Sequence, residues 1–77
     1  MEQKPQTFGE KAVGLSFNPS ANKDVEYVKA IFAKAIELLN DLRNNTESYE
    51  ARMAASKAIA EAQTAQMWAV KAITWTD

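Results

Sequence analysis

The sequence predicts an all-α protein, in which a short N-terminal helix and an apolar strap precede two long antiparallel helices. Residues 47–75 contain no Gly or Pro and are rich in Ala, Met, Glu, Lys and Gln, which favour a helix. Between residues 28 and 42, apolar residues recur at steps of three and four, as on one face of a helix. Only residues 44–46 separate the two runs, so we expect the helices to lie antiparallel. At this length, residues 1–77 form a single helical domain.

The short helix is expected over Phe8–Val13. Thr7 and Glu10 have the spacing of a capping box, in which each side chain accepts a hydrogen bond from the other residue's backbone. Gly14 can adopt the left-handed conformation that ends a helix. Residues 15–20 contain two apolar side chains and then a turn at Pro, so this segment is predicted to lie across the long helices as a strap.

The first long helix is predicted to begin after Asn22 and to run to about Arg43. Asn is a favourable N-cap, and Asp24 and Glu26 follow in the first turns, where the helix dipole favours negative charge. The expected core-facing stripe consists of seven apolar residues: Val28, Ile31, Phe32, Ala35, Leu38, Leu39 and Leu42.

The second long helix is predicted from about Glu47 to about Trp75, with Thr46 as its cap. One face carries an amphipathic stripe: Ala55, Ile59, Ala62, Gln66, Val70 and Ile73. Beside it lies a strip of alanines that would let another helix approach closely: Ala51, Ala54, Ala58, Ala65, Ala69 and Ala72. Trp68 and Trp75 fall on the side of the helix opposite the amphipathic stripe. One partner helix cannot cover all these faces, so we expect the protomers to pack into a helical homo-oligomer.

Composition excludes several classes of protein. The chain has no Cys and no His, so neither a disulfide nor a His/Cys metal site can stabilise its small core. Oligomerisation is the remaining common way to stabilise a domain of this size. A formal net charge of −1 gives no general reason to bind a DNA or RNA duplex. Residues 1–6 are polar, expected to be loose, and unlike a signal peptide. Gln66 and Lys71 interrupt the only long apolar run, so we expect no membrane contact and a cytoplasmic location.

The same composition argues against an enzyme. Without His or Cys there is no imidazole base and no thiol nucleophile, which removes the commonest catalytic arrangements. Gly9 and Gly14 match neither a P-loop nor a dinucleotide-binding fingerprint, and no cofactor is expected. We therefore predict no catalytic residues and no metal ligands.

Three residues form a candidate binding set. Phe8 offers an aromatic face for a nucleobase, Lys23 stands at a helix N-terminus that favours anions, and Arg52 offers a guanidinium for phosphate. Each has an ordinary structural alternative: Phe8 in the core, Lys23 solvated, and Arg52 extended past the end of the helix pair. Spacing alone supports a helical oligomer with an anion pocket.

Two segments extend this interpretation, FGEKAVGLSFNPS at 8–20 and AQMWAVKAITW at 65–75. They resemble the two signature segments of the bacteriophage anti-CBASS protein 2 family, whose members sequester the cyclic oligonucleotide messengers of bacterial CBASS immunity. The resemblance implies a hexamer that binds cyclic dinucleotides such as 3′,3′-cGAMP between protomers and cyclic trinucleotides at separate sites. It also implies that the messenger is held without cleavage in the cytoplasm of the infected bacterium, so that CBASS effectors are not activated.

The resemblance assigns roles to the candidate residues. The family's base-stacking aromatic matches Phe8, its basic residue at the start of the first long helix matches Lys23, and its phosphate-binding arginine matches Arg52. Three alternatives stay open: a structural or protein-binding oligomer without a small ligand, a cyclic-nucleotide hydrolase, and a compact nucleic-acid binder.

Overall fold

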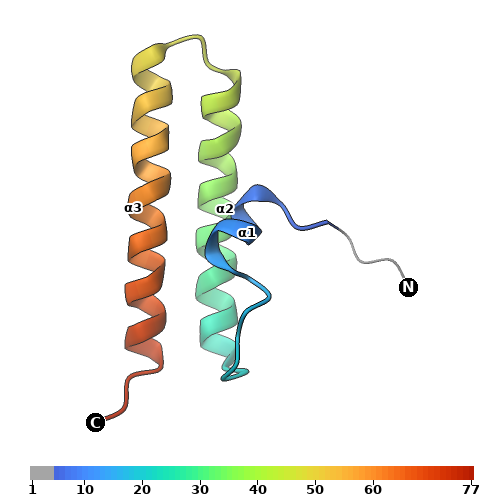
Figure 1. The fold of residues 1–77 in the computed structure, drawn as a ribbon, viewed down its shortest axis with the longest axis vertical. Helices are drawn as coiled ribbons and strands as arrows, with labels where there is room; N and C mark the ends of the chain where they lie inside the picture. Colours follow the sequence, from blue (N-terminus) through green and yellow to red (C-terminus); the bar gives the residue numbers. More distant parts are fainter. Residues whose placement is uncertain (1–4) are drawn as a thin grey trace.

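The computed structural model describes residues 5–77, and over this range it contains three α-helices and no strand. They are α1 (Phe8–Val13), α2 (Lys23–Asn45) and α3 (Tyr49–Ile73). Helices α2 and α3 form an antiparallel hairpin, and α1 packs against α2 (Figure 1). The all-α prediction and the order of a short helix before two long ones are confirmed. Residues 1–4, where the domain and the expected loose terminus begin, lie outside the described residues.

The caps of α1 form as predicted. The Thr7 hydroxyl accepts a hydrogen bond from the Glu10 N–H (3.1 Å), and the Thr7 N–H donates to a Glu10 carboxylate oxygen (2.9 Å). Gly14 follows the helix in the left-handed conformation, with φ 63° and ψ 50°. Local sequence signals therefore determine both ends of this helix.

The start of α2 also follows the prediction, whereas the start of α3 does not. The Asn22 side chain accepts from the N–H groups of Asp24 and Val25. The expected cap Thr46 instead ends α2, where its N–H donates to Leu42 O. Ser48 caps α3 by accepting from the Ala51 N–H at 3.1 Å.

The long helices therefore have different bounds from those predicted. α2 continues two residues beyond Arg43, and α3 covers Tyr49–Ile73 instead of 47–75. The physical reason is that both Thr46 and Ser48 can cap a helix, and the chain uses residues 46–48 to reverse direction.

The core lies where the three helices meet. Val13, Ala33, Ile36 and Ile59 form the buried cluster, and five partly buried residues pack against it: Ala12, Leu15, Phe32, Leu39 and Ala62. The predicted stripe of α3 faces this cluster, since Ala55, Ile59 and Gln66 are buried.

The predicted stripe of α2 is wrong in part. The buried residues of this helix are Val25, Lys29, Ala33 and Ile36. Three members of the predicted stripe are at least half exposed: Ile31 (50%), Leu38 (71%) and Leu42 (51%). At 100° per residue the buried face is turned by roughly a third of a circle from the prediction. The reason is that α1 and α3 both pack on this other face, and the chain leaves the predicted apolar face uncovered.

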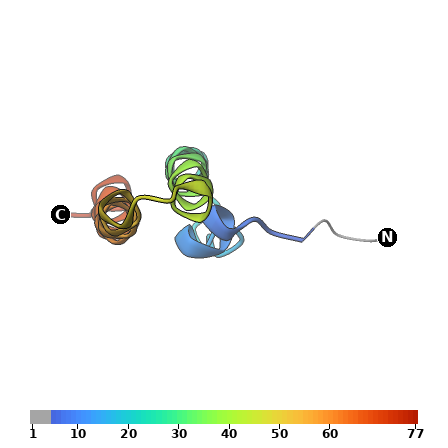
Figure 2. The same ribbon diagram turned by 90° about the horizontal axis from the view of Figure 1, so that it is seen from above.

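Viewed along the hairpin, α2 and α3 lie side by side, and α1 lies against α2 on one face of the pair (Figure 2). The Cα atoms extend over 46 × 39 × 12 Å, so the protomer is thin in one direction. Within residues 5–77, none of the helices is both long and apolar enough to cross a bilayer.

Candidate functional site

Phe8 is positioned by the close contact of α1 with α2. The Gly9 N–H donates to a carboxylate oxygen of Glu37 on α2 (2.9 Å). A Cβ at Gly9 would lie only 2.0 Å from the backbone oxygen of Ala33, so only glycine allows this approach. Phe8 is the residue before Gly9 and the first of α1, and it is consequently held against the C-terminal half of α2.

The ring of Phe8 lies beside the guanidinium of Arg43. The Arg43 Cζ is 5.2 Å from the ring centroid, within the range of a cation–π interaction. Arg43 Nε donates to the Asn40 side-chain oxygen (3.0 Å), and Nη1 donates to the Ser56 hydroxyl on α3 (3.2 Å). Phe8 remains 38% exposed. The three helices together therefore present an aromatic ring and a fixed cation at the surface, and we call Phe8 and Arg43 the ring–guanidinium pair.

Lys23 lies elsewhere in the protomer. It is the first residue of α2 and is exposed, beside a shallow hollow that it lines with Glu26, Tyr27 and Ala30. About 21 Å of helix axis separates Lys23 from Glu37, the residue to which Gly9 binds, at 1.5 Å per residue. One protomer does not bring Phe8 and Lys23 into contact.

Arg52 lies in the first turns of α3, close to the hairpin connection. It is exposed, and its Nη1 donates to the backbone oxygen of Thr46 (3.0 Å). Arg52 therefore closes the connection between α2 and α3. It is at the opposite end of the hairpin from Lys23 (Figure 1).

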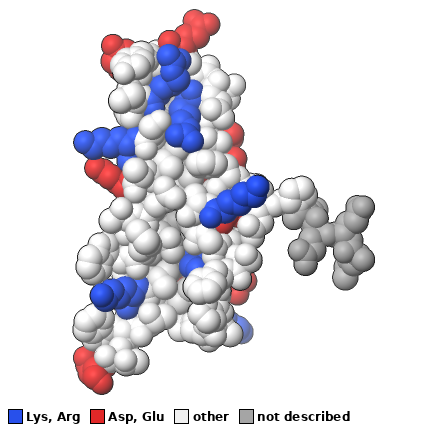
Figure 3. All heavy atoms as spheres, viewed as in Figure 1, with Lys and Arg blue, Asp and Glu red and all other residues white. Residues whose placement is uncertain are grey.

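Basic side chains gather near the hairpin connection. Arg43 lies in the last turn of α2, and Arg52 and Lys57 lie in the first half of α3. The space-filling view shows Lys and Arg side chains concentrated over this end of the face, with acidic side chains at the tip (Figure 3). The chain is slightly acidic as a whole, but this end of the face offers positive charge to an anion.

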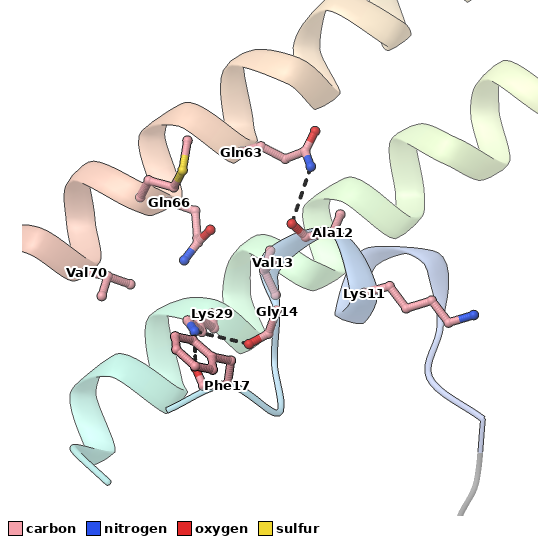
Figure 4. A pocket seen from close by; sticks show the side chains of 10 residues that line it. Lys11, Ala12, Val13, Gly14, Phe17, Lys29, Gln63, Gln66 and Val70 are labelled. Carbon is pink, nitrogen blue, oxygen red and sulfur yellow. Dashed lines mark hydrogen bonds between the residues drawn. The ribbon is translucent and has the colours of Figure 1, made fainter. Parts of the chain in front are cut away.

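A separate groove of about 520 Å³ lies between the strap and the C-terminal half of α3 (Figure 4). Lys29, only 6% exposed, donates through Nζ to the backbone oxygens of Gly14 (3.1 Å) and Phe17. The same Nζ is 5.6 Å from the centroid of the Phe17 ring. Burial of an ammonium requires such partners. Lys29 therefore ties the strap to α2 and builds the floor of the groove.

The other wall of the groove comes from α3. Gln63 Nε2 donates to the backbone oxygen of Ala12 (3.3 Å), which joins α3 to α1. Gln66 is 5% exposed and points toward Lys29 (Figure 4). Within residues 5–77 no group of three or more His, Cys, Asp or Glu side chains is placed to hold a metal ion.

Sequence reasoning did not identify Arg43 or Lys29. Arg43 has a sufficient explanation as a basic residue in the last turn of a helix, and 34 residues separate it from Phe8 in the chain. Lys29 carried one usable signal, because it interrupts the row formed by Val25, Ala33 and Ile36.

Comparison with known proteins identifies a family for this chain. A family model described as "Acb2/Tad1, hairpin domain" matches residues 10–74, which include Lys23, Arg43 and Arg52 but not Phe8. No curated protein and no solved structure matches the chain. The match covers most of the sequence and both long helices, in agreement with the resemblance of the segments at 8–20 and 65–75. The chain belongs to the Acb2/Tad1 hairpin family, the anti-CBASS protein 2 family.

Proposed function

We propose that this protein sequesters cyclic oligonucleotide second messengers and holds them intact, so that bacterial CBASS effectors are not activated. The observation that carries the proposal is the family match over residues 10–74. The ring–guanidinium pair supports it, because an aromatic ring and a fixed cation suit a nucleobase and its phosphate. The absence of His and Cys from the sequence fits a protein that binds its ligand without cleaving it.

The proposed site is shared between copies of the chain. Phe8 and Lys23 are separated along α2 in one protomer, so a pocket containing both takes Phe8 from one protomer and Lys23 from its neighbour. Assembly is supported by the many large apolar side chains at the protomer surface, among them Leu38, Met67 and Trp68, each more than 60% exposed. A hexamer, as the resemblance implies, supplies such neighbours.

Calorimetric titration with 3′,3′-cGAMP, followed by chromatography of the recovered nucleotide, tests the proposal. We expect saturable binding in the nanomolar range, about −12 kcal/mol, and recovery of unchanged ligand. Phe8→Ala removes the stacking surface and Lys23→Ala removes an anion contact, so both should weaken binding at least tenfold. The matched controls are Tyr49→Ala, an exposed aromatic at the first position of α3, and Lys34→Ala, an exposed lysine of α2.

Other outcomes would favour the alternatives. Cleaved nucleotide in the recovered fraction would identify a hydrolase. Salt-dependent binding to linear DNA or RNA without preference for cyclic ligands would identify a nucleic-acid binder. No heat with 3′,3′-cGAMP or with a cyclic trinucleotide would contradict the proposal and support a structural or protein-binding oligomer.

A further inference from the structure

The arginine beside Phe8 differs from the one that the sequence suggested. Arg43 packs against the ring of Phe8, whereas Arg52 donates to the backbone of the hairpin connection. We propose that Arg43, and not Arg52, is the arginine that binds a phosphate of the ligand whose base stacks on Phe8. This inference rests on the proposed function and names a further ligand-binding residue for it.

The first support is the donor capacity of Arg43. A guanidinium has five N–H donors. Within residues 5–77, Asn40 and Ser56 take two of them, which leaves three for a ligand. Both acceptors are neutral side chains, so they fix the guanidinium without cancelling its charge. The group keeps the capacity for a charge-assisted and bidentate contact with a phosphate.

The second support is the position of the guanidinium relative to the ring. The Cζ-to-centroid distance of 5.2 Å exceeds the roughly 3.5–4 Å between groups stacked face to face. The guanidinium is therefore not in face-to-face van der Waals contact with the ring, and Phe8 keeps 38% of its surface exposed. A base can stack on the exposed part of the ring while the phosphate attached to its sugar reaches the nearby cation.

The third support is that contacts within the protomer hold the Arg43 side chain in place. Its side chain bridges α2 and α3 through Asn40 and Ser56, and α1 places Phe8 against it. Fixing a long side chain in advance removes part of the entropic cost of binding. Arg52 is exposed and makes one side-chain hydrogen bond within the described residues, to Thr46 O.

Titration of 3′,3′-cGAMP into Arg43→Met and Arg52→Met tests the assignment. Methionine keeps the apolar stem and removes the charge in both variants. We expect Arg43→Met to weaken binding roughly 10- to 100-fold, and Arg52→Met to change it by less than about threefold. The affinity of Arg43→Met for 3′,3′-cGAMP should also vary less with NaCl between about 50 and 500 mM than that of the wild type, because an ionic contact is lost.

The salt dependence separates a phosphate contact from mere support of the Phe8 ring. Weaker binding of Arg43→Met with the salt dependence of the wild type would mean that Arg43 only holds the ring, and would overturn the assignment. Binding of Arg43→Met within threefold of the wild type would overturn it as well. If Arg43→Met does not fold by circular dichroism, Arg43→Gln, neutral but able to donate a hydrogen bond to Asn40 or Ser56, carries the same test.

The wild-type titration distinguishes failure of the proposed function from failure of the Arg43 assignment. If the wild type binds no cyclic nucleotide, the proposed function fails and this assignment fails with it. If the wild type binds and Arg52→Met is the variant with the larger loss, the proposed function stands and the phosphate belongs to Arg52.

Discussion

Gly9 determines how closely α1 approaches α2, and hence where Phe8 lies. Its N–H donates to Glu37, and its Cα faces the backbone of Ala33 without room for a side chain. The absence of a side chain at Gly9 is essential, since any Cβ would meet a backbone oxygen that cannot rotate away. The position of the Phe8 ring thus depends on its neighbour Gly9.

Gly9→Ala should therefore lower the free energy of unfolding by about 1–3 kcal/mol, the usual cost of forcing extra volume into a packed contact. The new Cβ would stand 2.0 Å from Ala33 O, so α1 must move away from α2. Urea denaturation followed by circular dichroism measures the change. Lys11→Ala, on the exposed side of the same helix, is the control and should change stability by less than about 0.5 kcal/mol. Equal stability of Gly9→Ala and the wild type would show that α1 is not docked in this way.

At the scale of the helix, the ends of the elements were predictable because their signals are local. The capping box of Thr7 and Glu10, the left-handed Gly14 and the Asn22 cap each involve residues within a few positions of one another. The start of α3 was not predictable from such local signals. Thr46 and Ser48 can both serve as the N-cap of α3, and the reversal of the chain decides between them.

The buried face of α2 and the partner of Phe8 were not predictable for a different reason. An apolar stripe indicates that a face will be covered, but not whether the same chain covers it. Ile31, Leu38 and Leu42 were expected in the core and lie at the surface of the protomer. The contact between Phe8 and Arg43 joins residues distant in sequence and exists only because α1 folds back onto α2.

Helix α3 also presents a face that the protomer does not cover. Trp68 is 64% exposed and Trp75 is 63% exposed, and Lys71 Nζ lies 5.4 Å and 5.9 Å from their ring centroids. Beside them is the strip of alanines, where small side chains permit a close helix contact. We expect this face of α3 to contact another copy of the chain.

Trp68→Ala and Ala69→Glu should consequently reduce the mass of the assembly. The first removes a large apolar contact, and the second places a charge in a tight apolar interface, where desolvation opposes it. Size-exclusion chromatography with light scattering measures the mass. Asp41→Ala, an exposed polar position of α2, is the control and should leave the mass unchanged. If both Trp68→Ala and Ala69→Glu assemble like the wild type, this face is not an interface.

For the whole molecule, the thin hairpin carries its candidate ligand residues at separated positions. Phe8 and Arg43 lie toward the hairpin connection, while Lys23 lies at the other end of α2. A single copy therefore holds parts of a site, and the uncovered apolar faces are the means by which copies would complete it. The proposed sequestration of a messenger by so small a chain therefore depends on assembly.

Mixed assemblies of Phe8→Ala and Lys23→Ala protomers test this account most directly. Each variant alone should bind 3′,3′-cGAMP weakly. When the two are co-expressed with different tags and purified through both, some sites combine an intact Phe8 from one copy with an intact Lys23 from its neighbour. Random assortment then restores about a quarter of the sites to wild-type affinity. Two differently tagged preparations of Phe8→Ala, treated in the same way, should restore none. A co-purified mixture of the two variants that binds no ligand, alongside a wild type that does, would contradict a site shared between copies.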